Sequence, residues 1–480
     1  MQAEELDKKT IKGFLWVMLG VCAQHLVDIS TKIVLVRLLL PVEFGIIATA
    51  YIVINLLRVL NETGISTALI RKNDADDESF STTFFFNILI SFISLVLAFI
   101  LAPLVAAYFK NNSLVPITRI LSLVIFIESF YYVHNMLLVK NLNFKYTVIP
   151  ELAAVIMYSV TGITLAYLNF GLWSLVWSSL VRSIVAVVLY WKLNPWRPKL
   201  HFNYSKLKTL LGFSIKVSVI RILRYARNNI DYLVIAKLLG PVFLGYYYVA
   251  YEVSHYCDTQ LFPLLSKIIF SAFGKLEDSG MIRRYYFKAV KYISIIGIPV
   301  SLVIFALSKW IVLFLYGSKW LPSAIPMQFL SLLGCLKLME NLVFSSLFIA
   351  KGNINKFFKI NITMFLINVI AVFIGVSHGI AGVAALLLSA GILNFIIIIF
   401  SIHPIINHKW DEYAKSLFPA ISSGAIMLVF LLLLRTLPYA GAVFLLPGVV
   451  LALTIYVIML KLWKIDIFGK IKFVDKTIIS

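Results

Sequence analysis

The sequence predicts an all-α, polytopic membrane protein, and three observations support this fold class. Hydrophobic residues make up 61% of the 480 residues and charged residues only 14%, whereas a soluble domain is about half apolar and about a quarter charged. The apolar residues form long runs near the ~20 residues that a transmembrane helix needs. Lys and Arg outnumber Asp and Glu by 43 to 22 and concentrate in alternate breaks, as expected of cytoplasmic loops.

Apolar runs of transmembrane length recur along the whole chain, and about 14 of them qualify by length. In chain order they span residues 12–40, 44–70, 79–108, 114–138, 147–168, 171–191, 209–239, 242–273, 285–315, 323–350, 357–376, 379–402, 415–435 and 441–462. The run at 209–239 is unusually polar. Because basic residues concentrate in every second loop and the number of runs is even, both termini are predicted to face the cytoplasm.

Charge and cysteine usage exclude several other classes. A net charge of +21 would suggest nucleic acid as the partner of a soluble chain, but here it indicates basic loops that meet anionic lipid headgroups. No nucleic-acid partner is therefore expected. Cys22, Cys257 and Cys335 lie in apolar runs without metal-ligand spacing, so neither a disulfide framework nor a metal site is predicted. The first apolar run is too long for a signal-peptide core and indicates a retained helix.

The longest polar break among the first twelve runs is "KLNPWRPKLHFNYSKLK" at 192–208. Its prolines end helices, and its Lys and Trp side chains suit a linker at lipid headgroups. The break divides the chain into two lobes of six helices each, followed by two further helices. The predicted domains are 1–192 (N-lobe), 193–208 (cytoplasmic linker), 209–402 (C-lobe) and 403–480 (last two helices and cytoplasmic tail).

An internal repeat supports this division. The stretch "VRLLLPVEFG" at 36–45 returns as "AKLLGPVFLG" at 236–245. Because each copy holds an even number of helices, both copies have the same orientation, and a pseudo-two-fold axis along the membrane normal is expected to relate them. Chance similarity between apolar helices is the alternative. A shift of 200 residues pairs Arg37 with Lys237, Pro41 with Pro241, Gly45 with Gly245, Ala50 with Ala250 and Tyr51 with Tyr251.

The sequence contains no pattern typical of an enzyme, since HExxH, GxxxxGK[ST] and the nucleophile elbow are all absent. A transporter is expected instead. Charges at bilayer depth are costly unless they line a pathway or pair with one another. The intramembrane charges are therefore the candidate site.

The run at 209–239 is the richest in such charges. At 100° per residue, Lys216, Arg224, Arg227 and Asp231 fall on one face about 80° wide, with Arg221 further round. Arg227 and Asp231 can pair at i,i+4, which leaves the face positively charged. Such a face suits an anionic headgroup, because the planar guanidinium can contact two phosphate oxygens at once. Contacts with carboxylates or helix ends of neighbouring helices are the alternative.

Three other runs carry polar residues at helical spacing. We expect Arg58 to bind the anionic headgroup with the cations of 209–239. The remaining residues, together with Asp231, are expected to line a polar cavity or to couple transport to an ion. Pairing within each helix, such as Arg58 with Glu62, is the alternative. The residues are His25, Asp28 and Lys32 in the first run, Arg58 and Glu62 in the second, and Glu252, His255 and Asp258 in the eighth.

The chain resembles a known group of transporters. The segments "VRLLLPVEFGIIATAYIVINLLRVLNETGISTALI" at 36–70, "NNIDYLVIAKLLGPVFLGYYYVAYEV" at 228–253 and "YGSKWLPSAIPMQFLSLLG" at 316–334 are similar to polysaccharide flippases of the O-antigen, colanic acid and teichuronic acid type. These flippases belong to the multidrug/oligosaccharidyl-lipid/polysaccharide exporter superfamily. The resemblance covers nearly all of residues 8–402, and two extra C-terminal helices are typical of the lipid-flipping members.

The resemblance implies two lobes in a V around a cavity lined by the first, second, seventh and eighth helices. It implies a flippase, not an enzyme, that moves undecaprenyl-pyrophosphate-linked oligosaccharide across the bacterial inner membrane by alternating access. The product would serve O-antigen, lipopolysaccharide or exopolysaccharide synthesis. Membrane lipids and a polysaccharide polymerase are the expected partners, and a monomer is expected. No cofactor is expected apart from coupling to a H⁺ or Na⁺ gradient.

Two members of the same superfamily are alternatives, a lipid II flippase and a cation-coupled drug exporter. A cationic drug would favour an acidic cavity, whereas the polar face at 209–239 is mainly basic. The alternatives from another class are a non-transporting scaffold and a membrane-embedded glycan-assembly enzyme such as a ligase. The enzyme is disfavoured, because such enzymes carry a large external loop and the predicted external loops here are short.

Overall fold

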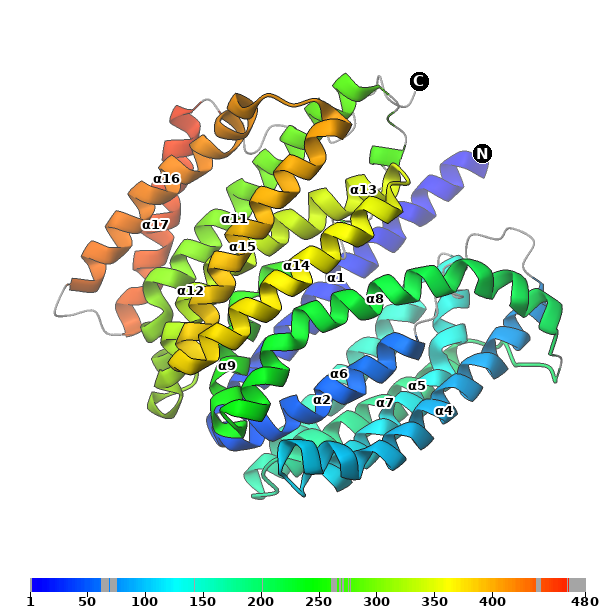
Figure 1. The fold of residues 1–480 in the computed structure, drawn as a ribbon. Coiled ribbons are helices and arrows are strands. Elements are labelled where there is room, and N and C mark those ends of the chain that lie inside the picture. The colour runs from blue at the N-terminus through cyan, green and yellow to red at the C-terminus, as the bar shows by residue number, and fades with distance from the viewer. Residues whose placement is uncertain are drawn as a thin grey trace. The chain divides into compact units, whose positions relative to one another are not determined.

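The computed structural model is built from α-helices with a few 3₁₀ turns and a π-helical turn throughout the part of the chain that it describes (Figure 1). The described residues are 2–61, 76–141, 143–200, 202–259, 278–436 and 442–463, with a few single residues between these ranges. For 2–15 and 204–220 the helical backbone is described and the side chains are not. The predicted all-helical architecture is confirmed for these residues.

The first seven apolar runs lie on helices of the structure. Continuous apolar sequence of this length forms helices because only a helix satisfies its own backbone hydrogen bonds in lipid. The end of the second run, predicted at residue 70, lies outside the described residues. The helices are α1 (Gln2–Leu38), α2 (Pro41–Asn61), α4 (Asp77–Phe109), α5 (Leu114–Lys140), α6 (Phe144–Tyr167), α7 (Trp173–Leu193) and α8 (Tyr204–Leu238).

The remaining runs also lie on helices, with one difference. The run predicted at 242–273 contains α9, which ends at Ser254, and after one turn residue, His255, the chain is helical again at 256–259. There the Ser254 hydroxyl donates to the Met327 carbonyl at 3.1 Å, and Gly334 lets the two helices approach so closely that a Cβ on it would lie 2.5 Å from the Ser254 carbonyl oxygen. The elements are α9 (Pro241–Ser254), α11 (Ser279–Leu315), η1 (Ser318–Ser323), α12 (Ala324–Met339), the π-helical η2 (Glu340–Ser345), α13 (Ser346–Ala350), α14 (Ile354–Gly375), η3 (Val376–His378), α15 (Gly379–Ile406), α16 (Trp410–Thr436) and α17 (Ala442–Leu462).

Local sequence determines where several helices begin and end. Asp76 is the N-cap of α4, and its carboxylate accepts a hydrogen bond from the Ser79 amide at 3.1 Å. Pro41 and Pro241 are the first residues of α2 and α9, where the missing N–H of proline is tolerated and its fixed φ favours the helix. Asn407 ends α15 in the left-handed region, with φ of 45°.

The chain forms two compact units, residues 1–245 and 246–480. In the first unit α4 packs on α5, α6 packs on α7 and α1, and α8 packs along α2 and α4. In the second unit α11 packs on α12 and α16, α15 packs on α12 and α14, and α16 packs on α17. The contacts therefore group α8 with the first unit, whereas the linker at 193–208 assigns it to the second lobe. The four domains proposed from the sequence stay a prediction.

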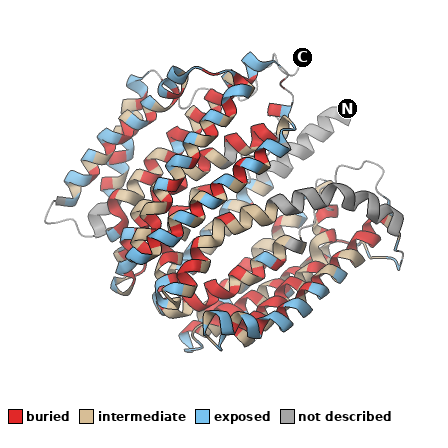
Figure 2. Ribbon diagram, in the orientation of Figure 1, coloured by how far each residue is buried: buried red, intermediate tan, exposed pale blue. Residues whose placement is uncertain are grey.

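Helix surfaces in both units suit a lipid environment. On α4, Ala102 is fully buried against neighbouring helices, whereas Ile100 and Leu104 expose 63% and 64% of their surface. Figure 2 shows buried and exposed residues following one another along the helices. Small buried residues let helices approach closely, and large exposed apolar residues suit lipid. Ten stretches of the described residues are long and apolar enough to cross a membrane, and one of them, Asn355–Ile406, includes both α14 and α15.

Arg283 joins α11 to the start of α16 at one end of the second unit. Its Nε donates to Glu412 Oε2 at 2.7 Å, and its Nη1 donates to the Asn407 carbonyl at 2.9 Å. His408 lies in the same junction, 3% exposed, with its ring centroid 5.0 Å from that of Tyr413. These contacts fasten the C-terminal pair of helices to the rest of the second unit.

Candidate functional site

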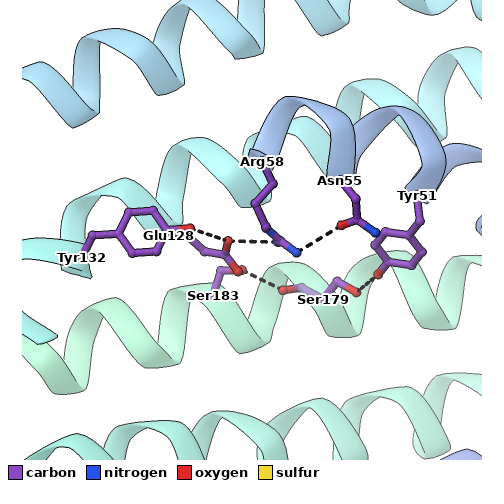
Figure 3. Close-up of polar contacts among 7 residues, drawn as sticks. All are labelled: Tyr51, Asn55, Arg58, Glu128, Tyr132, Ser179 and Ser183. Carbon is purple, nitrogen blue, oxygen red and sulfur yellow. Dashed lines mark hydrogen bonds and ion pairs between the residues drawn. The ribbon is translucent and has the colours of Figure 1, made fainter. Parts of the chain in front are cut away.

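Charged and hydroxyl-bearing side chains from α2, α5 and α7 meet inside the first unit (Figure 3). Arg58 of α2 forms an ion pair with Glu128 of α5, and 2.9 Å separates the guanidinium nitrogen from the carboxylate oxygen. Arg58 also donates to the side-chain oxygen of Asn55, three residues earlier on α2, at 3.3 Å. The Tyr132 hydroxyl donates to the same Glu128 oxygen at 3.3 Å. Glu128 therefore accepts bonds from two helices.

The Arg58–Glu128 pair is only partly shielded from the surface of the unit. The Arg58 side chain is 30% exposed and that of Glu128 is 17% exposed. Opposite charges at bilayer depth are tolerated when they pair, as these two do. Glu128 therefore holds the Arg58 guanidinium in place, and the contact of Arg58 with an anionic ligand stays a prediction.

A second carboxylate, Glu151 of α6, lies near the first. The Tyr190 hydroxyl of α7 donates to Glu151 Oε1 and to the Thr147 carbonyl, each at 3.2 Å. Arg182 of α7 attracts the Glu151 carboxylate, and Glu128 repels it. Tyr131 stacks on Tyr190 with ring centroids 4.9 Å apart and planes within 5°. The four charged residues, two Arg and two Glu, thus form one charge-balanced network across four helices.

Hydroxyl groups extend this network along α7. The Tyr51 hydroxyl lies 2.9 Å from Ser179 Oγ, and the Ser183 hydroxyl donates to the Ser179 carbonyl at 2.9 Å. On the neighbouring helix pair, Thr31 of α1 donates to Ser159 of α6 at 2.6 Å. These bonds satisfy polar groups that would otherwise be costly in the bilayer. The interior of the first unit is therefore polar along several turns.

The cationic residues that were predicted to bind the ligand lie on α8. Their contact with a ligand stays a prediction. Arg227 and Asp231 are buried, 7% and 3% exposed, whereas Arg221 and Arg224 are half-buried. Asp231 accepts a hydrogen bond from the Tyr232 amide at 3.0 Å. All four residues make further interactions within the protein. Lys216 lies in the part of α8 for which the structure describes the helical backbone and not the side chains.

Three of the predicted polar residues lie on α1. His25 and Asp28 are half-buried, and Lys32 is exposed. Asp28 lies within electrostatic range of the Tyr158 hydroxyl of α6. Glu62, the expected i,i+4 partner of Arg58, lies outside the described residues. Within them, the carboxylate that pairs with Arg58 is Glu128 of another helix.

The predicted polar residues of α9 and the segment after it lie in the second unit, where they meet α12. His255 is 1% exposed, and its ring stacks on Tyr251 with centroids 3.9 Å apart and planes within 5°. Lys337 of α12 lies 3.3 Å from the Tyr251 hydroxyl and 5.3 Å from its ring centroid. Asp258 is 9% exposed, and Glu252 lies near the Tyr316 hydroxyl. A cation and stacked rings thus form a second polar cluster.

Glu128 and Glu151 were not among the residues predicted from the sequence. Each stands alone in an apolar run, without another charge at i,i+3 or i,i+4 on the same helix, so helical periodicity gives no signal for it. Their position along the run could have identified them, because a carboxylate in the middle of a transmembrane run lies deep in the bilayer and is therefore a candidate site residue. No group of three potential metal ligands occurs among the described residues.

Comparison with known proteins identifies the family. A family model described as "Polysaccharide biosynthesis protein" matches residues 34–325, which is more than half of the chain. The chain belongs to this family. The family resemblance expected from the sequence is therefore confirmed.

Named proteins similar to this member of the polysaccharide biosynthesis family agree with that assignment. The lipopolysaccharide biosynthesis protein WzxC of Escherichia coli K12 is 27% identical over 423 residues, which cover 86% of this chain and 85% of WzxC. The teichuronic acid biosynthesis protein TuaB of Bacillus subtilis 168 is 23% identical over 365 residues, 75% of each chain. A structure of the lipid II flippase MurJ in an inward closed conformation matches with a TM-score of 0.73 and 15% identity, covering 94% of this chain and 98% of MurJ. At that identity the MurJ likeness concerns the fold alone.

Proposed function

We propose that this protein is a flippase that moves undecaprenyl-pyrophosphate-linked oligosaccharide repeat units across the bacterial inner membrane by alternating access. The observation that carries the proposal is the family match over residues 34–325, in a chain whose described residues include ten candidate membrane spans. A lipid with a large polar headgroup needs a polar route through the bilayer, and polar networks inside the helical units suit such a route. The protein then acts as a transporter and not as an enzyme.

The proposed architecture is fourteen transmembrane helices in two six-helix repeats plus α16 and α17, with a pseudo-two-fold axis along the membrane normal. Its support is the junction between helices in each repeat. Helices α1 and α8 end at Leu38 and Leu238, and α2 and α9 begin at Pro41 and Pro241, so a shift of 200 residues superposes both boundaries. The distribution of Lys and Arg supports cytoplasmic termini.

The proposed binding site for the pyrophosphate is the cationic face of α8, formed by Lys216, Arg221, Arg224 and Arg227, together with Arg58 of α2. Support comes from the partial exposure of Arg58, Arg221 and Arg224 on helices that pack together. Arginine binds phosphate with two parallel hydrogen bonds, so a few such residues can hold a pyrophosphate in a fixed orientation. The sugars would then occupy the wet part of the route and the prenyl tail would stay in lipid.

Coupling to a H⁺ or Na⁺ gradient is proposed to act through intramembrane carboxylates. Asp28, Glu62, Asp231, Glu252 and Asp258 are the carboxylates proposed from the sequence, with His25, Lys32 and His255 as neighbouring polar groups. Glu128 and Glu151 join them because both lie in the charged network of the first unit. A carboxylate that exchanges an arginine partner for a cation changes the charge of the network, which is the property that coupling requires.

A lipid II flippase is the second candidate function, and the MurJ-like fold favours it. The two functions share the undecaprenyl-pyrophosphate group and differ in the attached glycan. The family match favours a polysaccharide precursor over lipid II. A drug exporter is disfavoured because the polar face of α8 is cationic. Membrane lipids, a polysaccharide polymerase and a monomeric state complete the proposal.

Loss of the protein tests the function. Deletion from its bacterium is expected to abolish surface polysaccharide and to accumulate the lipid-linked repeat unit, and the wild-type chain is expected to restore export. The double variant Arg224→Gln/Arg227→Gln is expected to restore little export at normal protein level. The control Arg435→Gln removes an exposed arginine at a helix end and is expected to restore export fully. Unchanged surface polysaccharide after deletion would overturn the proposal.

A further inference from the structure

Three cations share one face of α11 near the start of that helix. At 100° per residue, Arg284, Lys288 and Lys291 fall within about 60° of one another. Arg284 is exposed, and Lys288 and Lys291 are half-buried. The 37 residues of α11 extend about 55 Å, whereas the hydrocarbon core of a bilayer is about 30 Å thick. The uncharged stretch 292–308 suits that core, so the cations before it lie at the level of the lipid headgroups.

Two of these cations have no acidic partner in the part of the chain that the structure describes. Within those residues, the side chains of Arg284 and Lys291 form neither an ion pair nor a hydrogen bond. Glu412, at the start of α16, is already paired with Arg283. Lys288 makes further interactions within the protein. Positive charge therefore remains on this face of α11.

Farther along α11, the same face is covered by α16 and α17. A Cβ on Gly424 of α16 would lie 2.8 Å from Leu302 Cδ1, and the Tyr456 hydroxyl of α17 donates to the Ile295 carbonyl at 3.1 Å. Ile295 and Leu302 fall within the same 60° as the cations, by the angle of about 100° per residue. The cationic part of the face therefore begins where the packing of three helices ends.

The end of α17 brings a fourth cation to this junction. Lys461 is exposed in the last turn of α17. Trp463, just after that turn, contacts Phe418 of α16 with ring centroids 5.3 Å apart, and Arg283 of α11 binds Glu412 earlier on α16. The end of α17 thus lies near the starts of α11 and α16. The two aromatic residues expose 46% and 54% of their surface, as expected at a membrane interface.

We propose that the cationic face of α11, formed by Arg284, Lys288 and Lys291, binds the headgroup phosphate of an anionic phospholipid together with Lys461. This site goes beyond the proposed function and rests on the orientation proposed there, which places this end of the helices at the cytoplasmic leaflet. Arginine and lysine donate to phosphate oxygens, and basic pockets between helices at this leaflet suit anionic headgroups. The bound phosphate joins α11 to the C-terminal helix α17.

Charge complementarity favours a lipid over the chain's own C-terminal segment as the occupant of this face. Residues 466–480 contain three Lys and two Asp, so their side chains bring no net negative charge. Exposed apolar residues beside the site, such as Met281 of α11 and Leu462 of α17, are 53% and 71% exposed and suit the acyl chains. A phospholipid supplies both the anionic group and the apolar chains that these surfaces fit.

Binding of phosphatidylglycerol with a fluorescent acyl chain to the purified full-length protein in neutral detergent tests the site. Wild-type protein should bind the probe saturably, and added salt should weaken the binding. Arg284→Gln/Lys291→Gln should weaken it about tenfold or more, because two charged contacts with the phosphate are lost. Lys461→Gln, a single change at an exposed position, should weaken it about threefold, and this variant keeps the test valid if the double variant fails to fold.

A matched control separates the site from the general positive charge of the protein. Lys356→Gln/Lys359→Gln also removes two exposed cations from the same end of the second unit, but from α14, and should bind the probe as the wild-type protein does. Competition separates the sources of phosphate. Unlabelled phosphatidylglycerol should displace the probe, whereas phosphatidylcholine should not.

Three results would overturn the site. One is equal affinity of the wild-type protein, Arg284→Gln/Lys291→Gln and Lys461→Gln for the probe. Another is displacement by undecaprenyl pyrophosphate and not by phosphatidylglycerol, which would assign the face to the transported lipid. The third is the absence of saturable binding to the wild-type protein, which would leave the face to another occupant such as residues 466–480. Probe binding needs no transport, so failed export with intact binding rejects the proposed function and keeps the site.

Discussion

Arg58 of α2 and Glu128 of α5 form an ion pair with 2.9 Å between nitrogen and oxygen, in the interior of the first unit. The pair joins two residues that are 70 positions apart in the chain. The ion pair joins α2, which begins in the repeated stretch at 36–45, to α5, which lies outside that stretch. The ion pair thereby fixes the position of the Arg58 guanidinium.

Removing Glu128 should destabilise the first unit. In Glu128→Gln the Arg58 guanidinium loses its counter-charge. Because both side chains are partly exposed, we expect a loss of about 1–3 kcal/mol, less than for a fully buried pair. Thermal unfolding in detergent measures it, and the double variant Arg58→Gln/Glu128→Gln should recover part of the loss. Asp77→Asn, which breaks an exposed pair with Lys199, is the control and should change stability by under about 0.5 kcal/mol. If Glu128→Gln and Asp77→Asn lower the stability by the same amount, the Arg58–Glu128 pair has no structural role.

The Tyr225 hydroxyl should stabilise the contact between α8 and α2. Tyr225→Phe removes the donor to the Ile52 carbonyl and keeps the ring. We expect a loss of about 0.5–1.5 kcal/mol, the usual net value of one hydrogen bond. Tyr167→Phe removes a hydroxyl from a side chain that is 67% exposed and should have little effect. If the two variants unfold at the same temperature, the hydrogen bond does not hold the helices together.

The guanidinium of Arg283 should matter for its shape as well as its charge. Two of its nitrogens contact Glu412 Oε2 at 2.7 Å, and a third contact reaches the Asn407 carbonyl. Arg283→Lys keeps the charge but cannot make all three contacts, so we expect a loss of about 1–2 kcal/mol and faster proteolysis at the start of α16. Lys415→Gln breaks the exposed pair with Asp411 and is the control. A charge-only role would leave Arg283→Lys as stable as the wild-type protein.

The junction before α16 should also make stability depend on pH. Burial lowers the pKa of the His408 imidazole, as do His403 and Arg283, while Glu412 raises it. A histidine with a lower pKa in the folded state takes up a proton on unfolding. Stability is therefore fully present above the unfolded-state value of about 6.5 and declines as the pH falls below it. We expect the melting temperature to fall from about pH 7 to about pH 5, and His408→Gln to reduce this fall.

The exposed control His378→Gln should leave the change of melting temperature with pH as it is in the wild-type protein. An unaltered slope in His408→Gln would show that other groups cause the pH dependence.

Much of the fold could be predicted from the sequence, because hydropathy and helix-breaking residues act locally. Pro41 begins α2 and Asp76 caps α4, and the predicted runs lie on the helices of the structure within a few residues at most ends. The single turn residue that follows Ser254, His255, was not predicted. Gly334 of α12 approaches the Ser254 carbonyl there, and nothing in the local sequence of α9 reports that contact.

The candidate site was harder to predict. Helical periodicity finds charges that share a helix, such as Arg227 and Asp231, but it cannot find the partner of Arg58. Glu128 lies on another helix, and packing alone brings the two together. The repeat was the more informative pattern, because it paired Gly45 with Gly245, and in the structure each of these glycines lies against the proline carbonyl of the other copy.

The central claim is that this protein moves lipid-linked oligosaccharide across a bilayer, and reconstitution tests it most directly. Purified protein is placed in proteoliposomes that contain undecaprenyl-pyrophosphate-linked oligosaccharide extracted from the same bacterium, and an impermeant lectin reports the glycan that reaches the opposite leaflet. The account predicts that wild-type protein transfers the glycan, that Arg224→Gln/Arg227→Gln transfers little of it, and that Arg435→Gln transfers it normally. Transfer that is equal with and without protein, or equal between wild-type protein and the double variant, would contradict it.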